Sequence, residues 1–118
     1  MRHTLRLHGV TVGWSDLEHT EPSVGRARGH FRAGLGYDLV EPVFRLFAEA
    51  APPNGPRDEA KLRRYHKSRD ALGLELFDDS GAVIPTSAIH IVDYEGGDSR
   101  ELDVLISDEA YWERRGGG

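Results

Sequence analysis

Arg26-Ala27-Arg28-Gly29-His30-Phe31-Arg32 is the stretch that decides the fold, because a cationic or imidazole side chain occupies every second position. Side chains alternate between the two faces of a β-strand, so this spacing predicts a strand with one basic face. Arginines in one row repel each other unless carboxylates, an anionic ligand or a partner protein oppose them. The stretch therefore predicts both a sheet and a candidate binding surface.

The N-terminal residues repeat this pattern. In a strand expected over residues 3–12, Leu5 and Leu7 fall on one face. The opposite face carries Arg2, Thr4, Arg6 and His8. If this strand lies beside the basic strand, the two pool their basic groups into one surface. The candidate binding residues are therefore Arg26, Arg28, His30, Arg32, Arg6 and His8.

The segment between these two strands carries helix and loop signals. Ser15 and Glu18 fit a capping box, which predicts one helical turn. A loop is expected over residues 19–23, and the basic strand is expected over residues 24–33.

Apolar periodicity predicts two helices in the middle of the chain. The first, over residues 38–50, carries a wide apolar stripe and must hold Pro42 in its first turn, where a missing amide donor is tolerated. The second, over residues 58–70, is capped by Asp58 and has a thin apolar seam, so it is expected at the surface. That seam consists of Leu62 and Tyr65.

The rest of the chain reads as an antiparallel meander. Strands are expected at 74–77, within 83–94 and at 101–106, with turns at 78–81 and 95–98 and a closing helical turn at 107–112. The sequence thus predicts one α+β domain over residues 1–113, with a mostly antiparallel sheet of about five strands. Two helices are inserted between strands 2 and 3 and packed on one face. Residues 114–118 are expected to form a flexible Arg/Gly tail.

Composition limits the classes of protein that this chain fits. A length of 118 residues suits one domain with one core. The chain has no cysteine, which removes disulfides, thiolate nucleophiles and cysteine-based metal sites and favours a reducing, cytoplasmic setting. The sequence shows neither a signal peptide nor an apolar run long enough to span a bilayer.

Charge is distributed unevenly along the chain. Residues 1–69 carry a net charge of +4 and residues 70–118 a net charge of −9, although the whole chain carries only −5. The basic strands are expected to face Glu75, Glu101 and Asp103 across the sheet. The overall negative charge disfavours broad nonspecific DNA binding, but it leaves room for a local basic groove.

The sequence contains no catalytic, metal-binding or cofactor-binding motif. It therefore gives no support for an enzymatic activity, a bound metal ion or a cofactor. The six histidines include no pair at helical metal-binding spacing. His19 lies near Asp16, Glu18 and Glu21 in sequence, which is more typical of a capped turn than of a metal site. An acid–base pair of Asp93 with His30 or His90 remains open.

The C-terminal residues Arg114-Arg115-Gly116-Gly117-Gly118 resemble the exposed Arg-Gly-Gly ending of ubiquitin-like modifiers. That resemblance implies a terminal glycine that is activated and conjugated to a target. Ubiquitin-like domains also begin with two strands and a helix, but the long first connection and the second helix depart from that pattern. A frayed end or a linker explains the same residues.

Two hypotheses of function follow from these patterns. In the first, the chain is a non-catalytic interaction domain that docks a protein partner through the basic strand face or the acidic C-terminal part. In the second, the face made by Arg26, Arg28, His30 and Arg32 binds a small anion or single-stranded nucleic acid. The sequence predicts neither the oligomeric state nor the identity of a partner.

Overall fold

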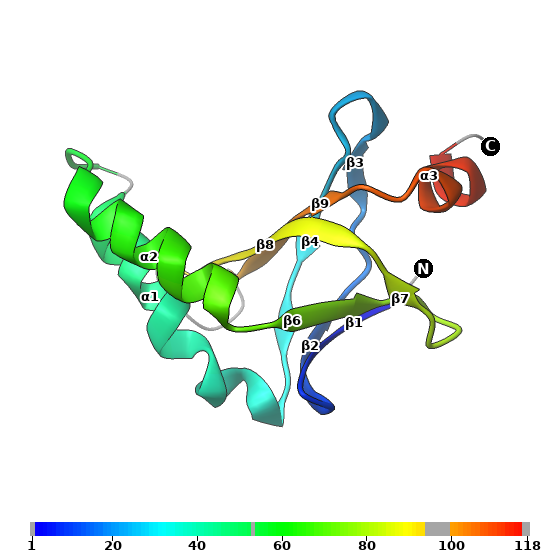
Figure 1. Ribbon diagram of the computed structural model, residues 1–118, viewed down its shortest axis with the longest axis horizontal. Helices are drawn as coiled ribbons and strands as arrows, with labels where there is room; N and C mark the ends of the chain where they lie inside the picture. The colour runs from blue at the N-terminus through cyan, green and yellow to red at the C-terminus, as the bar shows by residue number, and fades with distance from the viewer. Residues whose placement is uncertain (1, 53, 94–99, 117–118) are drawn as a thin grey trace.

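The computed structural model describes residues 2–52, 54–93 and 100–116 (Figure 1). Its strands are β1 (His3–Leu7), β2 (Val10–Ser15), β3 (His19–Glu21), β4 (Arg26–His30), β5 (Arg32–Ala33), β6 (Leu74–Phe77), β7 (Val83–Ile84), β8 (Thr86–Val92) and β9 (Glu101–Ile106). Its helices are the 3-10 helices η1 (Pro22–Val24) and η2 (Leu35–Leu39) and the α-helices α1 (Glu41–Ala50), α2 (Glu59–Ala71) and α3 (Glu109–Gly116). No helix within these residues is long and apolar enough to cross a membrane.

The strands form two antiparallel sheets, which confirms the α+β class. The five-stranded sheet has the order β5-β2-β1-β6-β7, and the four-stranded sheet has the order β3-β4-β9-β8. The prediction of a single sheet of about five strands is wrong, and so is the placement of the helices between strands 2 and 3, because α1 and α2 follow β5. One hydrophobic cluster draws buried side chains from both sheets, including Leu5, Val12 and Leu76 from the first and Ile91, Leu102 and Val104 from the second.

A tight hairpin replaces the single strand predicted over residues 3–12. β1 and β2 are joined by His8 and Gly9 alone, and both residues have positive φ angles, of 49° and 84°. Two successive left-handed residues match the twist of the flanking strands in a two-residue hairpin. The sequence pattern hid this turn because His-Gly is not one of the residue pairs that usually signal a two-residue hairpin.

The basic stretch itself is divided between the two sheets. β4 pairs with β9 in the four-stranded sheet, whereas β5 pairs with β2 in the five-stranded sheet. Between them, Phe31 is buried, and a Cβ atom at Gly13 would collide with its ring. Gly13 therefore allows Phe31 to fill the core where the chain passes from one sheet to the other.

The helices occupy the positions that the sequence predicts for them, with small shifts at their ends. The first begins later than expected, at Glu41, because residues 35–39 form η2, and Pro42 lies in the first turn as predicted. The side chain of Asp58 caps α2 by accepting a hydrogen bond from the amide of Lys61. α1 and α2 pack against each other, and both contact β8. In Figure 1 this helical pair lies at the opposite end of the molecule from α3.

The helical turn predicted at Ser15–Glu18 is wrong, because Ser15 still belongs to β2. Its hydroxyl accepts a hydrogen bond from the amide of Leu17, a buried residue with a positive φ of 46°. Glu18 reaches across instead and accepts from the amide of His30 at 3.2 Å. The predicted loop over 19–23 contains strand β3 and helix η1.

The strands predicted in the last part of the chain are present, but the single meander is wrong, because β6 pairs with β7 in the five-stranded sheet and β8 pairs with β9 in the four-stranded sheet. The turn at 78–81 is held by the carboxylate of Asp78, which accepts hydrogen bonds from the amides of Ser80 and Ala82. The turn predicted at 95–98 lies outside the described residues. α3 continues to Gly116, so Arg114 and Arg115 belong to this helix and not to the tail expected there.

Candidate functional site

Three of the predicted binding residues share the outer face of the four-stranded sheet. Arg26, Arg28 and His30 alternate along β4 with the buried Ala27 and Gly29. Carboxylates of β9 stand opposite them in the antiparallel register: Arg28 pairs with Asp103 and His30 with Glu101. Basic and acidic side chains thus alternate on one surface, in the arrangement expected for neutralisation within the domain.

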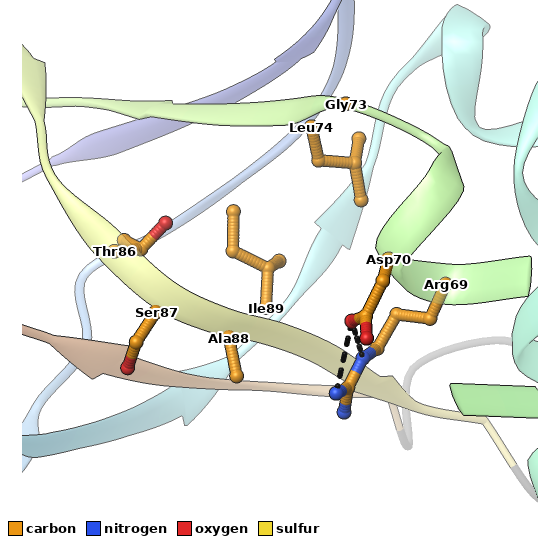
Figure 2. Close-up of a pocket in the computed structure, with 8 residues that line it drawn as sticks. All are labelled: Arg69, Asp70, Gly73, Leu74, Thr86, Ser87, Ala88 and Ile89. Atoms are coloured by element: carbon orange, nitrogen blue, oxygen red, sulfur yellow. Dashed lines mark hydrogen bonds and ion pairs between the residues drawn. The ribbon is translucent and has the colours of Figure 1, made fainter. Parts of the chain in front are cut away.

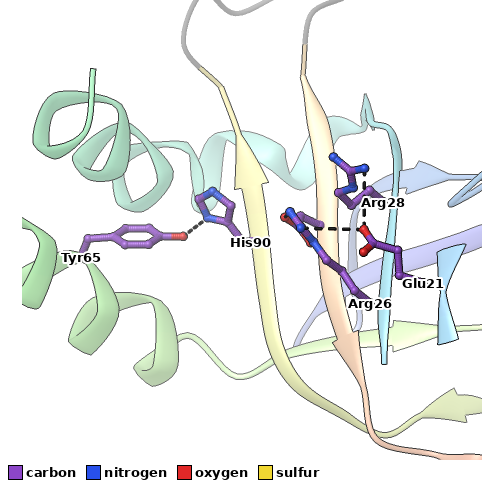
Figure 3. A network of polar contacts seen from close by, with 6 residues as sticks. Glu21, Arg26, Arg28, Tyr65 and His90 are labelled. Carbon is purple, nitrogen blue, oxygen red and sulfur yellow. Dashed lines mark hydrogen bonds and ion pairs between the residues drawn. The ribbon is translucent and has the colours of Figure 1, made fainter. Parts of the chain in front are cut away.

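Ion pairs tie this basic row to its neighbours. Arg26 donates two hydrogen bonds to the carboxylate of Asp103, at 3.0 Å from Nε and 2.6 Å from Nη2. The hydrogen bond to Asp103 raises the pKa of Arg26 above its ordinary value. Glu21 on β3 reaches both Arg26 and Arg28, at 4.0 and 3.9 Å (Figure 3). The geometry of Arg26 with Asp103 is bidentate, which is the strong form of this contact.

The remaining predicted residues lie elsewhere, so the pooled basic surface does not form. Arg6 on β1 and Arg32 on β5 belong to the five-stranded sheet, and His8 belongs to the turn between β1 and β2. β1 has β2 and β6 as neighbours, and the basic strand β4 has β3 and β9. Arg6 pairs with Glu75, as the charge pattern led us to expect.

A groove of about 400 Å³ lies on the outer face of the four-stranded sheet, beside the α1–α2 pair. Aromatic and aliphatic side chains line it together with charges of both signs. Its lining residues are Arg26, Phe47, Tyr65, His66, Arg69, Ala88, His90, Val92, Glu101, Asp103 and Leu105. Leu105 is 40% exposed, although it is flanked by Arg26 and Ala88 on the adjacent strands. The groove therefore offers apolar side chains among charges of both signs.

Tyr65 and His90 line one wall of the groove and are joined by a hydrogen bond (Figure 3). Burial lowers the pKa of His90 to about 4 and raises the pKa of Tyr65, so at neutral pH the imidazole is uncharged and the phenol is protonated. The Tyr65 hydroxyl and Nδ1 of His90 share this hydrogen bond, and its direction depends on which ring nitrogen carries the imidazole proton. Phe47 packs edge-on against His90, with the ring centroids 4.4 Å apart. These contacts fix the rings before any ligand arrives.

We expect His90→Gln to reduce the loss of stability on acidification. A pKa of about 4 in the folded chain against about 6.5 in the unfolded chain means that the unfolded state takes up the proton first as the pH falls. Titration of His90 should therefore lower the free energy of unfolding by up to about 3 kcal/mol as the pH falls from about 6.5 to about 4. Glutamine cannot titrate but still offers an acceptor to Tyr65. Urea unfolding at pH 7 and near pH 4 measures the difference.

The matched control is His19→Gln, which removes an exposed imidazole on β3. An equal reduction of the pH dependence in both variants would contradict the assignment to His90.

A smaller cavity of about 160 Å³ lies between the end of α2 and the edge strand β8 (Figure 2). Its walls are Arg69, Asp70, Gly73, Leu74, Thr86, Ser87, Ala88 and Ile89. The guanidinium of Arg69 donates to the carboxylate of Asp70 from both Nε and Nη2, each at 3.2 Å. Arg69 and Ala88 line this cavity as well as the groove, so the two hollows adjoin one another.

Asp93, which sequence reasoning paired with His30 or His90, bonds to different partners. It is buried, and it accepts hydrogen bonds from the hydroxyl of Tyr37 at 2.6 Å and from Nε of Arg100 at 3.0 Å. Burial acts to raise the pKa of Asp93, but the hydrogen bonds from Tyr37 and Arg100 outweigh it and lower that pKa. Arg100 also lies 3.5 Å from Glu41 on α1. This cluster joins η2, α1, β8 and β9, and its contacts support a structural role.

The part of the chain that the structure describes contains no group of three or more His, Asp or Glu residues placed to hold a metal ion. Two carboxylates near His19 are engaged elsewhere: Glu18 with the amide of His30, and Glu21 with Arg26 and Arg28.

One of the residues that resemble a ubiquitin-like tail, Arg115, is held by the loop after β2. Arg115 donates hydrogen bonds to the carbonyl oxygens of Asp16 and Leu17 and to the hydroxyl of Tyr111. Gly117 and Gly118 lie outside the described residues. Arg115 thus anchors α3 to the N-terminal part of the chain.

Sequence reasoning missed the groove. It treated Tyr65 as part of a thin helical seam and His90 as part of a half-buried strand of a meander, and no local pattern reports that α2 packs beside β8. It also missed that Trp14 and Phe77 share one face of the five-stranded sheet, because that relation depends on the order of the strands. One signal was available: Tyr65-His66 among basic residues already marked α2 as unusual for a solvated helix.

The chain was compared with protein-family models, with curated proteins and with solved structures. No family model, curated protein or solved structure matches it.

Proposed function

We propose that this protein is a non-catalytic interaction domain that docks a segment of a protein partner in the groove beside α1 and α2. The observation that carries the proposal is an apolar surface, with Leu105 exposed, among side chains of both charge signs. The basic strand face and the acidic C-terminal part, which the sequence singles out separately, meet at this groove through Arg26 and Asp103. The proposal thus combines the two docking surfaces into one.

The mixture of charges favours a polypeptide as the occupant. A polyanion would meet Glu101 and Asp103 at the groove, and Arg26 is already paired with Asp103. A peptide can place an apolar side chain over Leu105 and match both signs at the rim, as in protein interfaces with an apolar centre and a polar edge. The prearranged rings of Tyr65, His90 and Phe47 reduce the entropy that binding would otherwise cost.

We expect Leu105→Asp to weaken peptide binding at least about tenfold. Burial of one aliphatic side chain contributes about 1.5–3 kcal/mol, and about 1.4 kcal/mol corresponds to a factor of ten. Peptides are selected on the wild-type chain from a displayed random-peptide library, and their affinities for each variant are measured by fluorescence anisotropy.

The matched control is Val24→Asp on η1, where an exposed aliphatic residue outside the groove gains the same charge. Equal affinity of the selected peptides for the wild type and for Leu105→Asp would overturn the proposal. Equal weakening by Leu105→Asp and Val24→Asp would also overturn it, because it would show an effect of net charge alone.

A further inference from the structure

The outer face of the five-stranded sheet carries one continuous row of side chains. In the antiparallel register, Arg32 pairs with Trp14, Trp14 with Thr4, Thr4 with Phe77 and Phe77 with Val83. Residues paired across antiparallel strands point to the same face, so the row crosses every strand of this sheet. Trp14 and Phe77 are only partly buried, and Arg32 is exposed. Two aromatic rings therefore lie on an open surface.

Arginines lie over both of these rings. Arg2 and Arg6 stand on either side of Thr4 along the chain. The guanidinium carbon of Arg2 is 4.8 Å from the ring centroid of Trp14, and that of Arg6 is 4.7 Å from the ring centroid of Phe77. Each guanidinium is held by a cation–π contact, which leaves its in-plane N–H groups available as donors.

A cavity of about 240 Å³ opens on this face, lined by Arg2, Thr4, Arg6, Phe77, Asp78, Asp79 and Gly81. Nε of Arg6 is buried and has no hydrogen-bond partner among the described residues. The cavity thus combines the ring of Phe77 with the guanidinium of Arg6 stacked on it.

We propose that this face binds single-stranded nucleic acid. Proteins that hold single strands combine aromatic side chains, on which bases stack, with basic groups that follow the phosphates, and bases also stack on guanidinium planes. Arg32, Arg2 and Arg6 alternate here with Trp14 and Phe77 in that combination. The site is separate from the groove of the proposed function, which lies on the other sheet.

Carboxylates set the direction in which a strand would lie. Glu75 pairs with Arg6, and Asp78 and Asp79 line the cavity at the end of β6. These groups repel phosphates, so the phosphates would lie near Arg2 and Arg32, which flank Trp14, with a base stacked on the guanidinium of Arg6 that lies over Phe77. The same carboxylates and the net charge of −5 disfavour a duplex, whose binding relies on neutralising many phosphates.

The test measures binding of a fluorescein-labelled oligouridylate by anisotropy at several salt concentrations. We expect the variant with Arg2, Arg6 and Arg32 all changed to Gln to bind more weakly. The slope of log K against log salt should fall by about 1.4, because Arg2 and Arg32 contact the phosphates and each phosphate contact on a single strand contributes about 0.7. Trp14→Leu should weaken binding at least about fivefold. The unlabelled oligonucleotide should quench the tryptophan fluorescence of the wild type but not that of Trp14→Leu, in which Trp112 is the remaining tryptophan.

The matched control is the variant with Arg26 and Arg28 changed to Gln, which removes positive charge from the other sheet and should leave both the affinity and the quenching nearly unchanged. Failure of the wild type to bind the oligouridylate would overturn the proposal. So would equal weakening by the control, or equally tight binding of uridine monophosphate or of a duplex. A thermal melt of each variant separates lost binding from lost folding. Because Leu105→Asp leaves this face intact, the two proposals can fail independently.

Discussion

Phe44→Ala is expected to lower the free energy of unfolding by about 3–5 kcal/mol. The Phe44 side chain is fully buried on α1, where its ring packs edge-on against Tyr65 and His90 with centroid separations of 6.2 Å. The loss combines the removed apolar area with the cavity left behind. Small domains have only about 5–15 kcal/mol of stability in total, so the variant should be close to unfolding. Urea unfolding followed by tryptophan fluorescence measures the change.

The same substitution should loosen the groove, because Phe44 supports two of the rings that line it. Leu35→Ala is the control: Leu35 is fully exposed on η2, so its truncation should change stability by no more than about 0.5 kcal/mol. A Phe44→Ala variant that unfolds at the same urea concentration as the wild type would contradict the packing of α1 against α2 and β8.

Local signals account for what the sequence predicts correctly. Asp58 caps α2, Pro42 sits in the first turn of α1 and Asp78 closes its turn, and each depends on neighbours within a few residues. The strands that were missed or merged depend on backbone conformations that the alternation of polar and apolar residues does not predict. His8 takes a positive φ in place of glycine or asparagine, and Phe31 lets the chain change sheets without a break in the alternation.

The candidate sites were harder to predict because they depend on strand order. The alternation in β4 gives the correct face for Arg26, Arg28 and His30, and their opposition to Glu101 and Asp103 was also expected. The alternation does not indicate that Arg6 and Arg32 share a sheet with Trp14 and Phe77. The prediction from charge patterns therefore joined two surfaces that the fold separates. One surface carries charges of both signs, and the other carries arginines stacked on aromatic rings.

Arg100→Met is expected to cost about 3–5 kcal/mol at neutral pH, because it leaves the carboxylate of Asp93 buried without its cationic partner. The double variant with Asp93→Asn and Arg100→Met should recover much of this loss, since no buried charge then remains. A double-mutant cycle from urea unfolding gives the coupling free energy between the two residues. Additive losses would show that the two side chains do not act together.

The pH dependence of that cost separates the charge of Arg100 from its packing. In the wild type, the hydrogen bonds from Tyr37 and Arg100 lower the pKa of Asp93, so its contribution to stability is present at neutral pH and is lost as the pH falls through the folded-state pKa. In Arg100→Met, Asp93 loses the hydrogen bond and the charge of Arg100, so its pKa lies above the wild-type pKa, and protonation relieves the buried charge as the solution is acidified. The difference between the two proteins should therefore shrink from pH 7 toward pH 4. A cost that stays constant over this range would assign the role of Arg100 to its guanidinium stacked 4.6 Å from the ring centroid of Tyr37.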